Sequence, residues 1–127
     1  MTKKTVKDLQ KLTQTLRSNL GCPWDRSQTI TSLLKCMEDE VLEVKQAVEN
    51  ADHANLKEEL GDVLFQILMI SQIAKEKKYF TFDDVVENIH KKIVSRHTWV
   101  FGKDKAKTPE EAVAMWKKNK IKEKEEK

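Results

Sequence analysis

Apolar residues recur at alternating spacings of three and four along most of the chain, which is the period of amphipathic helices. Two such stripes occupy the middle of the sequence, one formed by Leu34, Met37, Val41, Val44 and Val48 and the other by Leu56, Leu60, Val63, Ile67, Ile70 and Ala74. A short polar segment around Asn50 and Asp52 separates them. Because a short connection makes neighbouring helices antiparallel, we expect a helix hairpin with its turn near residue 51.

Three further helices are expected on either side of this hairpin. The first has its apolar stripe at Val6, Leu9, Leu16 and Leu20, and the glycine and proline at positions 21 and 23 end it. The other two begin at capping boxes, which Thr81 forms with Asp84 and Thr108 forms with Glu111. No segment shows the alternation of a strand. The predicted fold class is therefore all-α, a helical bundle built on a central antiparallel helix hairpin.

The composition agrees with a helical protein and excludes several functional classes. With 3 glycines and 2 prolines in 127 residues, the chain lacks the turn residues of a β-sandwich or barrel. The net charge of +3 is evenly mixed, which argues against nucleic acid as a partner. No apolar run approaches membrane-spanning length, and Cys22 and Cys36 have neither zinc-site nor disulfide-scaffold spacing. We expect a cytoplasmic protein without a membrane partner, with one domain over residues 1–121 and a charged tail at 122–127.

Apolar side chains occupy more than one face of the two central helices. These additional positions are Leu33, Leu42, Leu64 and Leu68. Because a chain this short has little core of its own, the pattern predicts a homo-oligomer in which a second copy completes the bundle.

Each central helix also carries two carboxylates that lie one turn apart. They are Glu40 and Glu43 on the first helix, and Glu59 and Asp62 on the second. The pairs mirror each other about residue 51, since the inner two lie eight positions from it and the outer two lie eleven. Equidistant positions of an antiparallel hairpin lie at the same height, so the inner pair should face each other roughly 12 Å from the turn. The four flank the apolar stripes, and the row on the second helix continues to Gln66.

Two interpretations of these carboxylates stay open on the residues alone. Acidic residues make up 21 of the 127, so a solvated helix face explains each pair by itself. The mirrored register makes a cation site an equal alternative, because four converging carboxylates repel one another unless a cation neutralises them. Oxygen ligands suit Mg²⁺, or Mn²⁺, rather than a soft metal. The lack of Glu-x-x-His pairs excludes a ferritin-like di-iron site.

Three other segments offer groups for binding a nucleotide. Trp24 presents an aromatic face next to Asp25, although a buried Trp with Asp25 capping the next helix is the preferred explanation on physical grounds. Lys92 and Arg96 lie one turn apart, either as phosphate ligands or as basic residues that complement a helix C-terminus. Lys120 lies on the last helix, where an ordinary surface lysine is the alternative.

Together these segments resemble the MazG family of nucleoside triphosphate pyrophosphohydrolases over most of the chain. The resemblance rests on the order and spacing of six motifs: Gly-Cys-Pro-Trp-Asp at 21–25, acidic-Glu-x-x-Glu at 39–43, Glu-Glu-Leu-Gly-Asp at 58–62, Phe-Asp-Asp-Val-Val at 82–86, Arg-His-x-x-Val-Phe-Gly at 96–102 and Trp-x-x-x-Lys at 116–120. It implies an all-α fold, a homodimer or a dimer of dimers, and Mg²⁺-dependent hydrolysis of a nucleoside triphosphate to the monophosphate and pyrophosphate. It is also consistent with a house-cleaning role against non-standard nucleotides.

The resemblance also implies roles for individual residues. The metal ligands it implies are the four carboxylates that the register selects, Glu40, Glu43, Glu59 and Asp62. The attacking water needs a base, for which the candidates are Glu43 and the neighbouring Asp39. The candidates for phosphate contacts are Lys92, Arg96 and Lys120, and those for nucleoside contacts are Trp24 and Asp25.

The sequence departs from the family pattern at two places. Position 39 is Asp where the family usually has Glu, and positions 98 and 99 are Thr and Trp where Pro and His are commoner. Two alternatives remain: a related all-α pyrophosphohydrolase acting on dUTP, dCTP or phosphoribosyl-ATP, and a non-catalytic helical interaction module. The motifs at 21–25 and 96–102 favour the MazG family over the first alternative. The presence of all four carboxylates argues against the second.

Overall fold

The computed structural model describes residues 2–126, in which seven helices and no strands occur. The helices are α1 (Val6–Leu16), α2 (Pro23–Ser27), α3 (Ile30–Glu49), α4 (His53–Glu76), α5 (Phe82–Arg96), α6 (Thr98–Phe101) and α7 (Pro109–Glu125). The predicted all-α class is confirmed, and α2 and α6 were not predicted because they are too short to show a helical period. The chain divides into two compact units between Phe82 and Asp83. None of the described helices combines the length and apolarity that a membrane span requires.

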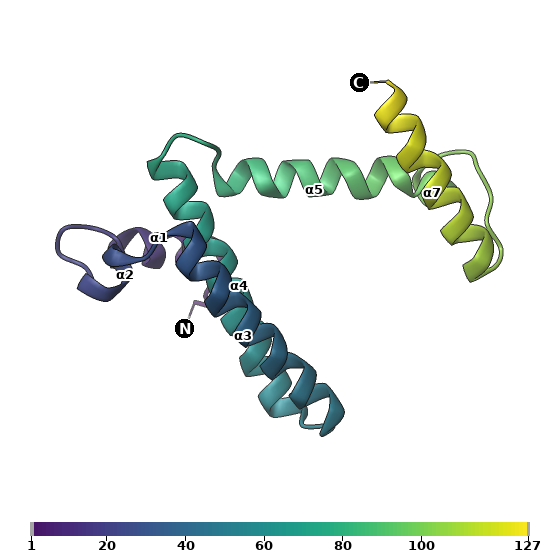
Figure 1. Cartoon of the computed structure of the whole chain (residues 1–127). Helices are drawn as coiled ribbons and strands as arrows, with labels where there is room; N and C mark the ends of the chain where they lie inside the picture. Colours follow the sequence, from purple (N-terminus) through teal and green to yellow (C-terminus); the bar gives the residue numbers. More distant parts are fainter. Residues whose placement is uncertain (1, 127) are drawn as a thin grey trace. The chain divides into compact units, whose positions relative to one another are not determined.

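The central hairpin is formed by α3 and α4, which lie side by side and antiparallel (Figure 1). After the C-cap residue Asn50, the chain reverses at Ala51, whose φ of 51° lies in the left-handed region. Asp52 then caps α4, because its side chain accepts a hydrogen bond from the backbone N–H of Asn55 at 3.1 Å. The predicted hairpin and the position of its turn are therefore confirmed.

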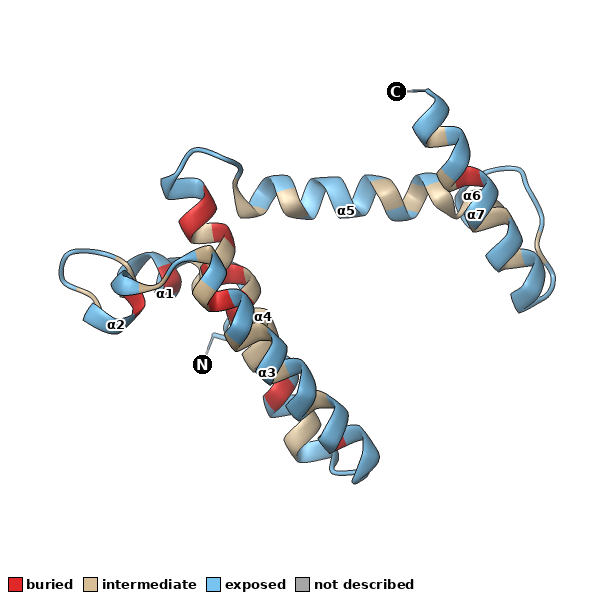
Figure 2. Cartoon of the chain, viewed as in Figure 1, coloured by how far each residue is buried: buried red, intermediate tan, exposed pale blue. Residues whose placement is uncertain are grey.

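The two hairpin helices bury only part of the predicted stripes: Ala74 is fully buried and Ile70 packs against the core, whereas other stripe residues stay exposed. Three residues of those stripes, Leu34, Val41 and Leu60, are 50%, 51% and 52% exposed. The buried apolar residues of the hairpin include Leu33, Ala47, Met69 and Ile73. Figure 2 shows that most of the hairpin's buried residues lie toward the end where α1 packs against α4. Periodicity identifies the apolar face of a helix but not the surface that covers it, which is why the stripes predicted only part of this seam.

The first helix ends at Leu16, earlier than its stripe predicts, and Leu20 is 98% exposed. The chain turns tightly here, and the backbone N–H of Cys22 donates to the carbonyl of Leu16 at 2.9 Å. A Cβ at Gly21 would overlap the carbonyl oxygens of Thr15 and Leu16, so this turn requires a glycine. The apolar spacing that placed Leu20 on the helix is therefore overridden by the turn.

The second unit consists of α5, α6 and α7, and Asn119 links them. This side chain is 9% exposed, and its Nδ2 donates to the carbonyl of Arg96 at 3.0 Å and to Oγ1 of Thr98 at 2.9 Å. The predicted start of α7 is confirmed, because Oγ1 of Thr108 accepts from the N–H of Glu111 at 3.1 Å. This helix runs on to residue 125, so the expected boundary at residue 121 falls inside it. The single domain over residues 1–121 stays a prediction.

Candidate metal centre

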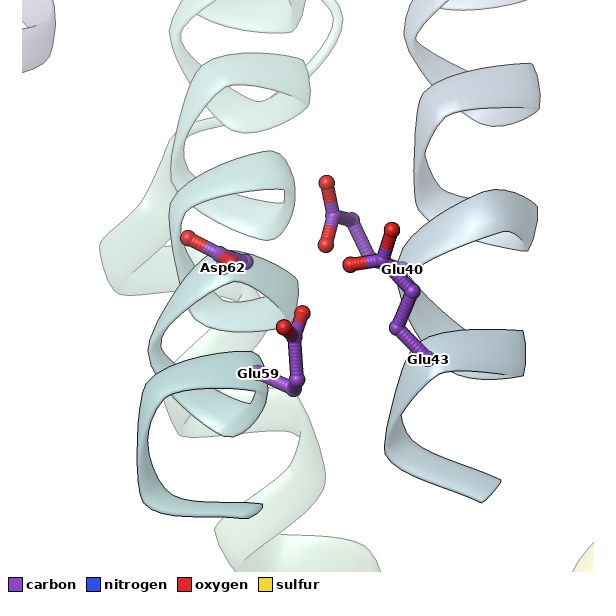
Figure 3. Close-up of side chains that lie close together, drawn as sticks. All are labelled: Glu40, Glu43, Glu59 and Asp62. Atoms are coloured by element: carbon purple, nitrogen blue, oxygen red, sulfur yellow. The ribbon is translucent and has the colours of Figure 1, made fainter. Parts of the chain in front are cut away.

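Four carboxylates from α3 and α4 meet inside the central hairpin, two from each helix. They are Glu40, Glu43, Glu59 and Asp62, and one oxygen from each can be chosen so that all lie within 4.8 Å of one another. Figure 3 shows the two α3 side chains reaching toward those on α4. The mirrored register therefore brings these residues together as predicted. Of the four, Glu59 is buried at 8% exposure, Glu40 and Asp62 are half-buried and Glu43 is exposed.

The close approach of these groups changes their protonation. Hydrogen bonding to Glu43, burial and the negative charge of Glu43 raise the pKa of Glu59 to about 8. Burial and the charges of Glu43 and Asp62 also raise the pKa of Glu40. In the metal-free protein the cluster therefore holds protons at pH values where isolated carboxylates are ionised.

The cluster also contains oxygens that lack a hydrogen-bond donor. Oε2 of Glu40 and Oε2 of Glu59 are buried and have no partner among the described residues. Buried acceptors of this kind cost free energy unless a donor or a cation reaches them. The donor set consists of carboxylate oxygens alone, which fits Mg²⁺ or Mn²⁺ and does not fit a thiolate-preferring metal.

The structure places the two candidate bases differently. Glu43 is exposed and belongs to the cluster. Asp39 is also exposed, but its carboxylate is not one of the four that converge. Asp39 and Glu40 are consecutive residues of α3, and one step along a helix turns the two side chains roughly 100° apart.

In the segment before α3, the side chain of Trp24 is exposed and that of Asp25 is buried. Trp24 is 57% exposed and Asp25 is 8% exposed, so the expected buried Trp is not observed. Thr29, not Asp25, caps α3, because Oγ1 of Thr29 accepts from the N–H of Ser32 at 3.1 Å. The preferred structural explanation for this motif was therefore wrong, and the aromatic face stays available for a ligand.

Arg17 holds this turn against α4, and sequence reasoning missed it. Its Nε and Nη2 each donate to the Glu76 carboxylate at 2.8 Å. Its Nη1 donates to the carbonyl oxygens of Asp25 at 2.5 Å and Gln28 at 3.3 Å. This network holds the pKa of Glu76 below its usual range, and the hydrogen bonds from Arg17 are the main cause. No local pattern could have identified a pair that is 59 residues apart in the chain.

In the second unit, two of the three basic candidates share one aromatic ring. Arg96 lies over Trp116 with its Cζ 4.9 Å from the ring centroid, and Nζ of Lys120 lies 5.4 Å from the same centroid. Nε of Arg96 also donates to the Glu123 carboxylate at 3.0 Å. Lys92 is half-buried on α5 and takes no part in these contacts. The structure thus joins Arg96 and Lys120 and leaves Lys92 apart.

The fold and this geometry define a class: an all-α protein with a candidate divalent-cation site of four carboxylates inside a helix hairpin. The family model described as the MazG nucleotide pyrophosphohydrolase domain matches residues 28–101, which include all four carboxylates. This chain belongs to that family, and the resemblance noted from the motifs is confirmed.

Relatives of known sequence and structure agree with this assignment. The chain is 41% identical over 95 residues to a nucleoside triphosphate pyrophosphohydrolase/pyrophosphatase MazG of Thermotoga maritima, which covers 75% of this chain and 37% of that protein. It is 36% identical over 107 residues to a nucleoside triphosphate pyrophosphohydrolase of Escherichia coli, covering 84% of this chain and 41% of that protein. A crystal structure of a mazG-related protein from Thermotoga maritima superimposes with a TM-score of 0.76 at 31% identity, covering 91% of this chain and 98% of that one. The chain thus spans less than half the length of these two curated relatives.

Proposed function

We propose that this protein hydrolyses nucleoside triphosphates to the monophosphate and pyrophosphate, with Mg²⁺ as the natural cation and Mn²⁺ as a substitute. The observation that carries the proposal is the convergence of four carboxylates within 4.8 Å in a chain of the MazG family. The relatives from Thermotoga maritima and Escherichia coli bear the name of this activity. Their similarity supports the same activity for this chain.

The proposed metal ligands are Glu40, Glu43, Glu59 and Asp62. A bound divalent cation neutralises phosphate charge and lowers the pKa of a coordinated water. The protein contributes the geometry: two rigid helices hold the ligands on facing surfaces, one turn apart on each. Deprotonation of Glu59 is required for it to act as a ligand, and a cation in the cluster supplies the opposite charge that favours this.

We also propose which residues act as the general base and which contact the nucleoside and the phosphates. Glu43 or Asp39 takes the proton of the attacking water, and Glu43 is favoured because its carboxylate lies in the cluster. The exposed ring of Trp24 stacks on the nucleobase, and Asp25 contacts the nucleoside from the turn fixed by Arg17. The proposed phosphate contacts are Lys92, Arg96 and Lys120.

We also propose that the active form is a homodimer or a dimer of dimers. Part of the predicted apolar stripes remains exposed on the single chain, with Val48 at 59% as well as Leu34, Val41 and Leu60. Contiguous exposed apolar surface on a helix pair marks an interaction site. A second copy of the hairpin would cover it and complete a helical bundle.

Removal of non-standard nucleotides in the cytoplasm is the proposed role for this activity. The first experiment is therefore pyrophosphate release from a panel of ribo-, deoxyribo- and damaged nucleoside triphosphates that includes dUTP and dCTP, with phosphoribosyl-ATP added. Each substrate is measured with Mg²⁺ and with EDTA. This panel ranks the substrates and tests the related pyrophosphohydrolases as alternatives.

The variant Glu59→Gln connects the activity to the cluster. We expect it to lose turnover and to fold normally, because replacing one of four repelling carboxylates removes an electrostatic cost. Glu58→Gln is the matched control, since Glu58 is the exposed neighbour of Glu59 on α4. Full Mg²⁺-dependent activity in Glu59→Gln would refute the site, and no release from any substrate would favour the non-catalytic interaction module.

A further inference from the structure

One turn beyond the carboxylates, α4 places Gln66 inside the hairpin. This side chain is 9% exposed, and its carbonyl oxygen Oε1 has no hydrogen-bond partner among the described residues. Gln66 follows Asp62 by four positions and Glu59 by seven, so all three lie on one face of the helix. An amide oxygen buried in this way is uncommon, because it lost its water on folding and received no donor in return.

Helix geometry directs Gln66 toward the cluster. Side chains of an α-helix lean toward its N-terminus, and from Gln66 that direction leads along α4 to Asp62 and Glu59. The same rule applied to α3 directs Glu40 away from the hairpin turn, toward the layer that contains Gln66. Gln66 and Glu40 therefore approach the same part of the seam from the two helices.

The two residues present the same kind of unsatisfied atom. Oε2 of Glu40 is buried and unpartnered, as is Oε1 of Gln66. Apolar side chains close the hairpin beyond them, since Leu33 and Met69 are at most 1% exposed. Two acceptors that point toward the same part of the seam can share one donor, and a water molecule has two protons to donate.

We propose that Gln66 is a positioning residue of the metal centre: its amide oxygen accepts a hydrogen bond from a water that the bound divalent cation holds beside Glu40. The inference rests on the proposed cation site and not on nucleotide hydrolysis. It assigns Gln66 to the site through a water, because an amide oxygen accepts a hydrogen bond from such a water and orients it without adding charge. Neighbouring groups of this kind commonly set metal affinity by 10-fold to 100-fold.

The test measures binding of Mn²⁺ and Mg²⁺ to the full chain without nucleotide, by isothermal titration calorimetry and by the metal-induced rise in Tm. In Gln66→Met the side chain keeps its length and loses the acceptor. We expect Mn²⁺ affinity to fall about tenfold, and the Tm of the metal-free protein to stay constant or rise because a buried unpartnered oxygen is gone. Gln14→Met is the matched control, since Gln14 is exposed on α1, and it should change neither quantity.

A second variant separates the amide oxygen from the amide NH₂ group. Gln66→Glu keeps the shape of the side chain and an oxygen acceptor, so it should bind Mn²⁺ at least as tightly as the parent, whereas a role of the NH₂ group predicts a loss. Gln66→Met with parental Mn²⁺ affinity, or Gln66→Glu with weakened affinity, would overturn the inference while the cation site stands. Failure of the parent to bind either cation would overturn both the site and the inference.

Discussion

Cation binding to this protein should release a proton from Glu59, and the release should depend on pH in a defined way. The pKa of Glu59 is raised to about 8 by hydrogen bonding to Glu43, by burial and by neighbouring charge. A bound cation requires the ionised form, so binding below this pKa must displace the proton. At pH 7 the release from Glu59 should be about 0.9 proton per site, and at pH 9 about 0.1.

The ionisation of Glu59 also sets how strongly the affinity for the cation depends on pH. Glu59 binds the cation only when it is deprotonated, so its ionisation alone should raise the apparent affinity for Mg²⁺ about thirtyfold between pH 6.5 and pH 9. The stability of the metal-free protein should change with pH in the opposite direction to the metal affinity. Because the folded state binds more protons than the unfolded state between about pH 4.5 and 8, stability should fall as pH rises through this window.

Calorimetric titration of Mg²⁺ in two buffers that differ in their enthalpy of ionisation measures the proton release directly. Urea unfolding of the metal-free protein from pH 5 to pH 8.5 measures the stability slope, and Glu59→Gln should flatten it. Proton-free binding at pH 7, or an affinity that is constant from pH 6.5 to pH 9, would refute the assignment of a raised pKa to the binding carboxylate.

Three further predictions concern contacts and turns within the two units. Arg17→Met should cost about 3 kcal/mol, because it breaks a bidentate ion pair with Glu76 and frees two backbone carbonyls. This loss corresponds to a Tm lower by about 10 °C in thermal unfolding followed by circular dichroism, and a change under 2 °C would contradict it. Ala51→Gly should stabilise the protein by about 0.5–1 kcal/mol in urea unfolding, since φ at Ala51 is 51°; a loss of stability would show that this turn is not strained. Asn119→Ala should speed amide hydrogen exchange in α6 about tenfold, since it removes the hydrogen bond to Thr98, and parental exchange rates would show that α6 is held by other contacts.

The sequence predicted the hairpin and the carboxylate cluster because both depend on local spacing. The position of the turn follows from the short polar segment around Asn50 and Asp52. Once the turn is known, antiparallel geometry pairs Glu43 with Glu59 without any knowledge of packing. A helix end was harder to predict, since α1 stops at Leu16 although Leu20 continues its apolar spacing.

Interactions between distant segments escaped prediction for a physical reason. The pair of Arg17 and Glu76 depends on how α1 docks against α4, and the contacts of Arg96 with Trp116 depend on how α5 meets α7. Neither has a periodic signal, because a side chain selects such a partner only after the backbone is placed. The sequence identified Arg96 as a basic residue near a helix end, but it did not show that Glu123 holds it.

Two features of the hairpin connect the stability of this fold to its proposed function. The seam contains buried oxygens of Glu40, Glu59 and Gln66 that have no hydrogen-bond partner among the described residues, and the outer surface exposes Leu34 and Val41. Both features are unfavourable for an isolated hairpin, because one buries unsatisfied acceptors and the other exposes apolar surface. A cation in the seam and a second copy on the outer surface relieve them separately. We therefore expect cation binding and self-association each to raise Tm, and a variant that loses one to retain the response to the other.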